Sequence, residues 1–146
     1  MTRAMDLSPA MRREITEACE RLVLDYAHLA DTGRMDEWAQ LFAEDAEVRV
    51  SGQVQKGREA IRNAVSGIEM ATLHCTFNIR IEVISEDRAE GTSYGATYVR
   101  PKDGPGTVAV VEPAAVGVRR DRYRRTADGW RFESRTLEPF LTRARS

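Results

Sequence analysis

The stretch LHCTFNIRIEV, residues 73–83, decides the fold, because apolar and polar residues alternate along its whole length. Successive side chains of a strand point to opposite faces of a sheet. The alternation therefore predicts one long strand with an apolar face at the odd positions and a polar face at the even positions. His74 and Asn78 share the polar face, where each side chain either meets a ligand or stays in solvent.

Turn-forming residues divide the sequence after this stretch into further strands. PKDGPG at residues 101–106 predicts an exposed loop, and ADG at residues 127–129 predicts a hairpin turn. Pro113 falls within an expected strand, where it would mark a bulge or bend because proline lacks a backbone donor. We therefore expect strands at residues 89–100, 107–125 and 130–137.

Upstream of the stretch, the apolar residues follow the period of a helix. Ser8 and Pro9 are typical of a helix start, and Gly33 suits the left-handed residue that ends one. Between them, apolar residues recur every three or four positions and mark one buried face. The members of this face are Ile15, Cys19, Leu22, Tyr26 and Leu29.

Two shorter helices are expected before the first long strand. Asp36 predicts the N-cap of the first, which would turn Trp38 and Phe42 inward. The second covers residues 57–65, and a short strand at residues 46–50 separates the two helices.

Helices thus fill the first half of the chain and strands the second half. This segregation predicts an α+β fold rather than an alternating βαβ fold. The expected architecture is a single domain, residues 1–146, in which three N-terminal helices pack on a strongly curved, mainly antiparallel sheet.

Composition narrows the function. The 146 residues include 22 Lys and Arg against 23 Asp and Glu, a net charge of −1, which argues against a nucleic-acid binder. The arginines of residues 119–125 favour a solvated strand end over RNA binding. No apolar run approaches the ~18 residues of a membrane span, and the N-terminus lacks the apolar core of a secretory signal. Two cysteines are too few for a secreted disulfide scaffold, so the cytoplasm is the expected compartment.

Metal and cofactor motifs are not apparent in the sequence. Two histidines, His28 and His74, argue against a multi-histidine metal site. Neither a glycine-rich phosphate loop nor a Ser-His-Asp arrangement is evident. We therefore expect no metal and no cofactor.

Four stretches of the sequence, in their order, carry a family resemblance. They are LVLDYAHLADTGRMDEWAQLFAEDAEV (22–48), GREAI (57–61), TLHCTFNIRIEV (72–83) and DRYRRTADGWRFESRTLEP (121–139). Together they resemble the SnoaL-like branch of the NTF2-like, or cystatin-like α+β, superfamily. The resemblance covers about residues 12–140 and implies a cone of curved sheet closed by helices.

Within that superfamily, the site pattern resembles hexachlorocyclohexane dehydrochlorinase, bile-acid 7α-dehydratase and scytalone dehydratase. The resemblance places Tyr26 and Asp31 near the end of the first helix and His74 on the first long strand. Those enzymes also use an arginine from a later strand. The candidates for it share one strand parity and are Arg120, Arg122 and Arg124.

The resemblance implies a role for each catalytic candidate, and each has an ordinary structural alternative. His74 would be a general base, since a neutral imidazole accepts a proton near pH 7; otherwise it is an exposed strand histidine. Asp31 would accept the Nδ1–H of His74 and stabilise the imidazolium; otherwise it forms the turn after the helix. Tyr26 would donate a hydrogen bond to a leaving oxygen; otherwise it is a core residue.

Other side chains are candidates for substrate binding. Trp38, Phe42 and Tyr94 are placed to line an apolar pocket for a ring-shaped ligand, or else to fill the core. Asn78 and Arg122 complete the expected binding set.

Three classes of function follow from these residues. The first is a cofactor-independent lyase of the dehydratase or elimination type, or a related isomerase, that acts on a small cyclic hydrophobic molecule. The second is a non-catalytic module that binds such a ligand. The third is a structural partner similar to the β subunit of ring-hydroxylating dioxygenases. The first is favoured because it gives Tyr26, Asp31 and His74 a common purpose.

A homodimer formed through the sheet is also expected. Helices can cover one face of a curved sheet, and surplus apolar surface on the other face needs a partner. The apolar residues that suggest this partner are Leu73, Cys75, Phe77, Ile79, Ile81, Val108, Val110, Val116 and Val118.

Overall fold

The computed structural model describes residues 3–109 and 112–143. It has three α-helices, α1 (Pro9–Asp31), α2 (Met35–Ala39) and α3 (Arg58–Ala64), after a short 3₁₀ helix at Ala4–Asp6. Its strands are β1 (Phe42–Val50), β2 (Gln53–Lys56), β3 (Met70–Val83), β4 (Arg88–Pro101), β5 (Ala115–Thr126) and β6 (Gly129–Thr142).

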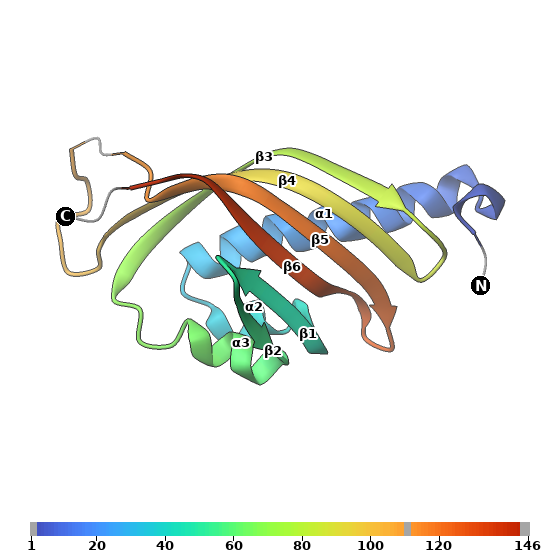
Figure 1. Cartoon of the computed structure of the whole chain (residues 1–146), viewed down its shortest axis with the longest axis horizontal. Coiled ribbons are helices and arrows are strands. Elements are labelled where there is room, and N and C mark those ends of the chain that lie inside the picture. Colours follow the sequence, from blue (N-terminus) through green and yellow to red (C-terminus); the bar gives the residue numbers. More distant parts are fainter. Residues whose placement is uncertain (1–2, 110–111, 144–146) are drawn as a thin grey trace.

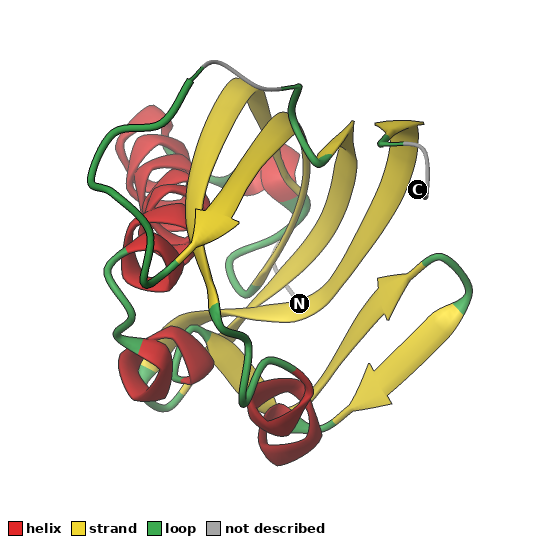
Figure 2. Cartoon of the chain, turned by 90° about the vertical axis from the view of Figure 1, so that its left-hand side faces the viewer, coloured by secondary structure: helices red, strands yellow, loops and turns green. Residues whose placement is uncertain are grey.

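The six strands form one sheet in the order β2-β1-β6-β5-β4-β3. Every neighbouring pair is antiparallel except β1 and β6, which run parallel. Figure 1 shows β3 to β6 lying across α1, and Figure 2 shows the sheet curling around the helices. This confirms the predicted α+β fold with a strongly curved, mainly antiparallel sheet.

The inner face of the sheet is buried against α1. The predicted helix face is present, and Ile15, Cys19, Leu22 and Leu29 are all buried. Each fully buried aliphatic side chain contributes about 1.5–3 kcal/mol, so packing rather than intrinsic propensity holds the helix in place. The same core cluster includes Trp38, Ala39, Phe42, Ile61, Tyr123 and Phe132. In the described part of the chain, no helix has both the length and the apolar character needed to cross a bilayer.

The early strands differ from the prediction. The expected strand at residues 46–50 is only the second half of β1, which begins at Phe42. It forms a hairpin with β2, which the sequence did not reveal because its four residues, QVQK, have too little apolar character. Asp36 is not the N-cap of α2, because the helix begins earlier and its N-cap is Arg34.

The expected strand at residues 107–125 begins only at Ala115. Pro113 therefore precedes the strand rather than bending it, as its missing backbone donor would favour. Val110 lies outside the described residues.

A bulge in β3 overturns the prediction of a single apolar face. Asn78 has a positive φ of 52°, and the pairing with β4 shifts register between Phe77 and Arg80. One extra residue exchanges the two faces of a strand, because side chains alternate with a period of two. Leu73 and Phe77 consequently point outward and are 60% and 52% exposed, whereas Ile79 packs against the core.

Candidate active site

Asp31 and His74 are in direct contact. The Nδ1 atom of His74 lies 2.5 Å from Oδ1 of Asp31, and the backbone N–H of His74 donates to Oδ2 at 2.8 Å. Thr72, two residues earlier on β3, donates its hydroxyl to Oδ1 at 2.9 Å. The side chains of Asp31 and His74 are only 16% and 14% exposed. Three donors thus hold one carboxylate in a mostly buried position.

The end of α1 places Asp31 there. Gly33 has a φ of 72°, a conformation that suits glycine after a helix, and the backbone N–H of Arg34 closes the last turn on Leu29 O at 2.9 Å. Thr32, rather than Asp31, caps the helix, since its hydroxyl donates to His28 O at 2.7 Å. The carboxylate of Asp31 is therefore free to point at β3. A negative charge is disfavoured at a helix C-terminus by about 0.3–1 kcal/mol, and the donors from β3 offset that cost.

The hydrogen-bond pattern defines the tautomer of His74. An ionised carboxylate can only accept, so the short contact requires that Nδ1 carries the proton. Among the described residues, Nε2 has no hydrogen-bond partner. A neutral His74 in this arrangement has a basic nitrogen that points away from Asp31 and is available to a ligand.

Tyr26 stands beside this pair. Its ring lies 6.2 Å from the His74 ring in an edge-to-face arrangement and 5.4 Å from the ring of Trp38. In the part of the chain that the structure covers, the Tyr26 hydroxyl has no hydrogen-bond partner. Trp38 Nε1 is buried and also lacks one. The Tyr26 hydroxyl is thus left for a ligand, whereas Trp38 Nε1 is buried within the wall.

A cavity of about 710 Å³ connects these groups. Its lining includes Tyr26, Asp31, Trp38 and His74, so the structure brings all three catalytic candidates and one binding candidate to one space. Apolar residues from the helices, the loop before β3 and the start of β3 form much of the rest of the wall, together with two cations and the polar residues Thr32, Ser66 and Thr72. These residues include Ala30, Met35, Val65, Ile68, Met70, Ala71, Arg62 and Lys102.

Four predicted binding residues lie elsewhere. Phe42 is fully buried behind Tyr26, with ring centroids 6.2 Å apart, and does not line the cavity. Asn78 and Tyr94 are exposed, because the β3 bulge turns Asn78 away and the parity of β4 turns Tyr94 outward. Arg122 is 68% exposed and faces Glu90 at 3.7 Å. None of these four side chains lines the cavity.

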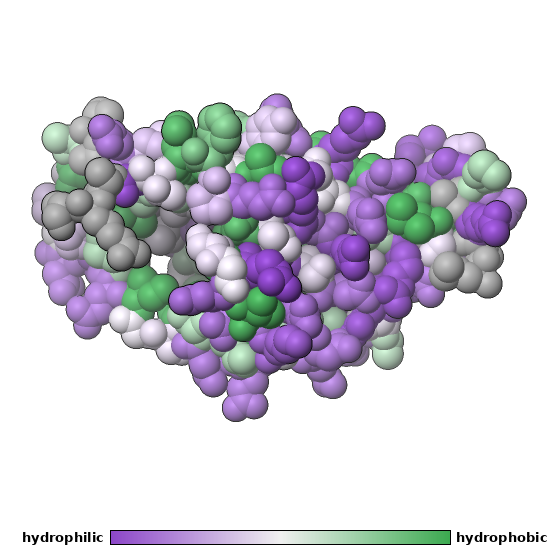
Figure 3. Space-filling model, viewed as in Figure 1, coloured by the Kyte–Doolittle hydropathy of each residue, from purple (hydrophilic) through white to green (hydrophobic). Residues whose placement is uncertain are grey.

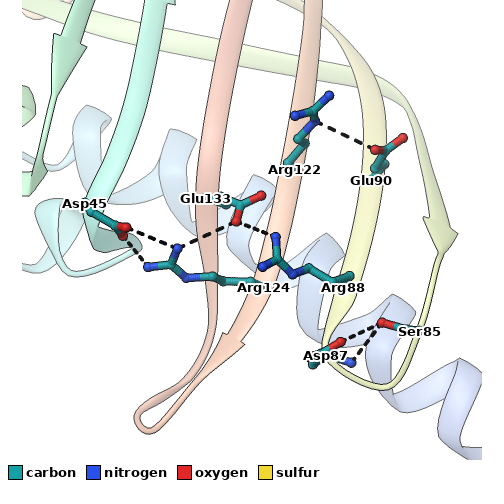
Figure 4. Close-up of polar contacts among 8 residues, drawn as sticks. All are labelled: Asp45, Ser85, Asp87, Arg88, Glu90, Arg122, Arg124 and Glu133. Carbon is teal, nitrogen blue, oxygen red and sulfur yellow. Dashed lines mark hydrogen bonds and ion pairs between the residues drawn. The ribbon is translucent and has the colours of Figure 1, made fainter. Parts of the chain in front are cut away.

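The other two arginines of the predicted parity are also on the outer face. Figure 4 shows Arg124 between Asp45 and Glu133, and Arg122 beside Glu90. Arg120 donates to Glu138 at 2.9 Å. The ion pairs of Arg120 and Arg122 are exposed and contribute little to stability.

The arginines near the site are instead Arg119 and Arg135. The guanidinium of Arg135 lies 4.2 Å from the centroid of the Tyr26 ring, and that of Arg119 lies 5.8 Å from it. Both side chains come from positions of β5 and β6 that face the inside of the sheet. The predicted solvated strand end is therefore wrong for Arg119, which is 5% exposed. Periodicity shows that β5 has two faces, but it does not show which of them is covered.

Asp121 balances the charge of Arg135. Its two oxygens accept from Arg135 at 2.8 and 2.9 Å, and Oδ2 also accepts from the Tyr123 hydroxyl at 2.9 Å. Burial by itself lowers the pKa of Arg135, but the charge and hydrogen bonds of Asp121 reverse this and raise it above its usual value. Burial and the same carboxylate raise the pKa of Tyr123. This hydrogen-bonded cluster forms the floor beneath Tyr26.

Metal ligands are not gathered at the site. Among the described residues, no group of three or more His, Cys, Asp or Glu side chains is arranged to hold a metal ion. The chemistry that the arrangement itself can perform is proton transfer, with Nε2 of His74 as acceptor and the Tyr26 hydroxyl as donor.

Comparison with known proteins identifies the family. The SnoaL-like domain matches residues 11–136 of the chain. The chain belongs to the SnoaL-like family. This confirms the resemblance inferred from the sequence. A search of curated proteins found no match to the chain.

Solved structures agree with this assignment. A proposed scytalone dehydratase from Novosphingobium aromaticivorans is 25% identical, with a TM-score of 0.79 over 92% of this chain and 89% of that one. An NTF2-like protein with a cystatin-like fold from the same species is 26% identical, with a TM-score of 0.73 over 99% and 94%. LinA, at 22% identity, shares the fold with a TM-score of 0.75 over 96% and 100%. A SnoaL-like domain with such neighbours is of the lyase, isomerase or ligand-binding type.

Proposed function

We propose that the protein is a cofactor-independent lyase of the dehydratase or elimination type, or a related isomerase, acting on a small cyclic hydrophobic substrate. His74 acts as the general base and Tyr26 as the hydrogen-bond donor. Asp31 orients His74 and stabilises its protonated form. The observation that carries the proposal is the 2.5 Å contact between Asp31 and Nδ1 of His74 at the wall of the cavity.

The proposed reaction begins at Nε2 of His74. This atom removes a carbon-bound proton, and the electron pair of the broken C–H bond forms a double bond as the leaving group departs from the neighbouring carbon. The Tyr26 hydroxyl gives its proton to that leaving group, so hydroxide leaves as water and Tyr26 is left as a tyrosinate. Asp31 stabilises the imidazolium as it forms, and the proton of the imidazolium then restores Tyr26, either directly or by way of the solvent.

The cavity supports a ring-sized substrate. Small-molecule sites commonly enclose ~300–1,000 Å³, a range that includes this cavity. Tyr26 and Trp38 offer flat apolar surfaces next to the base. A base of this kind contributes about 10²–10⁴-fold to the rate, so positioning between these rings must supply much of the remaining acceleration.

Hydrogen–deuterium exchange at carbon tests the base directly and needs no knowledge of the natural substrate. The protein is incubated in D₂O with a ring ketone such as 2-tetralone, and loss of the α-proton signal is followed by NMR. We expect exchange above the buffer rate, and a fall of at least about 10²-fold in His74→Ala. His28→Ala is the matched control, since His28 is the only other histidine and is exposed.

The alternatives give different results in the same experiment. A non-catalytic binding module would bind the ketone without accelerating exchange. Equal exchange rates in His74→Ala and the unaltered protein would remove His74 from the reaction and refute the proposal.

We also propose that a second copy of the chain covers part of the outer face of the sheet. Leu73, Phe77, Tyr94 and Tyr98 are exposed there on β3 and β4 and pair across the strands. Figure 3 shows hydrophobic residues in several separate places among hydrophilic ones. Arg120 and its neighbours already pair with glutamates of their own chain, so they leave little net charge to repel a copy. Ile79 and Ile81 face inward and do not contribute.

A further inference from the structure

Arg119 is a buried cation without an acidic partner. Within residues 3–109 and 112–143, no carboxylate lies within ion-pair distance of it, and its side chain makes one hydrogen bond, from Nη1 to Thr76 Oγ1 at 3.3 Å. The nearby acids are already engaged, Asp121 with Arg135 and Asp31 with His74. Burial and the charge of Arg135 lower the pKa of Arg119. A buried charge in this state gains strongly from an added anion.

The strand beneath Arg119 makes room for its guanidinium. Gly95 lies under it on β4, where an added Cβ would be 2.5 Å from the Arg119 Cζ atom. A side chain of any size at this position would displace the cation. The sequence of β4 thus keeps the guanidinium inside the sheet rather than letting it reach solvent.

A second, smaller cavity of about 100 Å³ adjoins Arg119. Its wall is formed mainly by inward-facing residues of β1, β4, β5 and β6, among them Val50, Gly95, Thr97, Gly117 and Leu137. Its volume corresponds to about three water molecules at ~30 Å³ each, which is enough for a carboxylate group. Arg119 is the one basic residue among its lining residues, which also include Glu138, whose carboxylate pairs with Arg120.

This smaller cavity lies next to the catalytic groups. Arg119, on its wall, stands 5.8 Å from the ring of Tyr26, which lines the larger cavity. Thr97, also on its wall, pairs with His74 across β3 and β4. Thr76, the hydrogen-bond acceptor of Arg119, is two residues beyond His74, about 7 Å along a strand. His74 and the guanidinium of Arg119 therefore lie on the same inner face of the sheet, and each is near the ring of Tyr26.

We propose that Arg119 and the smaller cavity bind a carboxylate of the substrate, so that the substrate is a small ring acid rather than a neutral hydrocarbon. The carboxylate occupies the cavity beside Gly95 and accepts hydrogen bonds from the guanidinium. The ring then lies against Tyr26 with its reacting carbon toward Nε2 of His74. The catalytic part of this statement rests on the proposed function, whereas binding of the carboxylate does not.

Ligand binding tests the inference without turnover. Calorimetry compares benzoate with benzyl alcohol, a neutral ligand of similar shape, at pH 7 and low ionic strength. We expect the unaltered protein to prefer benzoate by about 10- to 100-fold, the range of a charge-assisted hydrogen bond. Arg119→Gln should lose this preference but retain its affinity for benzyl alcohol. Arg120→Gln, a neighbour on the outer face of the same strand, is the matched control and should keep the preference.

A crystal structure of the unaltered protein with benzoate gives a second, variant-independent test, which also covers the case in which Arg119→Gln does not fold. The carboxylate is expected within 3.2 Å of the guanidinium of Arg119. A carboxylate bound at Lys102 or Arg62, or an Arg119→Gln protein that still prefers benzoate, would overturn the inference. Carboxylate binding at Arg119 without any proton exchange at carbon would keep this inference and refute only the catalytic proposal.

Discussion

Two carboxylates, Asp121 and Asp31, each hold a partner side chain near Tyr26, but the surroundings of the two pairs differ. Asp121 and Arg135 are both 0% exposed at the side chain, and the guanidinium is held by two hydrogen bonds. Asp31 and His74 form one short contact at the wall of a cavity, and one nitrogen of the histidine remains free. The difference shows how one side of Tyr26 is fixed by a closed ion pair while the other side presents a group that can exchange protons.

The largest effect is expected at the pair of Asp31 and His74, which is open to the cavity. Asp31→Asn should lower the rate of proton exchange by about 10³–10⁴-fold, because an amide no longer stabilises the imidazolium or enforces the Nδ1–H tautomer. The free energy of unfolding should fall by only about 1–2 kcal/mol, because the amide oxygen still accepts one donor. NMR exchange rates and urea titrations measure the two quantities. A variant with full exchange activity would show that Asp31 is structural.

The closed pair of Asp121 and Arg135 should show the opposite pattern, with its main effect on stability. Asp121→Asn leaves Arg135 buried without a compensating charge and should lower the free energy of unfolding by about 3–5 kcal/mol. Urea unfolding measures the loss, and Glu90→Gln, which breaks the exposed pair with Arg122, serves as a control that should change it by less than about 1 kcal/mol. Equal losses in the two variants would contradict the assignment of Asp121 to the structural side.

Sequence alone could predict the helices, the order of the long strands and, through the family resemblance, the contact of Asp31 with His74. It could not predict that Arg119 and Arg135 are the arginines near the site. A period of two shows that a strand has two faces but does not show which face is covered. The β3 bulge adds to this limit, since a single residue, Asn78, reverses the faces on either side of it. The pairing of Asp121 with Arg135 depends on strand register between β5 and β6, which no local pattern in either strand encodes.

Tyr26 lies between the two pairs, and removing its hydroxyl separates its roles. Tyr26→Phe keeps the ring on which Arg135 rests, so the free energy of unfolding should change by less than about 1 kcal/mol. The rate of elimination should fall by about 10-fold, the worth of one hydrogen bond in the transition state, and more for poor leaving groups. Kinetics with hydroxide and halide leaving groups on the same ring would measure this. An equal loss for both groups would exclude Tyr26 as the donor.

The smallest effect concerns Cys19, which is buried on α1 near the closed pair. Burial, helped by the charge of Asp121, raises the pKa of Cys19 from 9.0 to about 12. Above pH 9 the unfolded chain releases this thiol proton while the folded chain keeps it, so stability falls as pH rises from about 9 to 12. The thiol should account for a loss of about 1 kcal/mol by pH 10. Urea unfolding at pH 8 and 10 should show this loss to be smaller in Cys19→Ala; identical losses would contradict it.

The central claim is that Asp31 orients His74 so that Nε2 is a base facing the cavity. The most direct measurement is the ¹⁵N NMR spectrum of the two histidine rings at a pH where both are neutral, with His28 as the internal reference. The structure predicts that His74 exists as one tautomer, with the proton on Nδ1, and that Asp31→Asn loses this preference. A His74 ring with its proton on Nε2, or a tautomer mixture like that of exposed His28, would contradict the account.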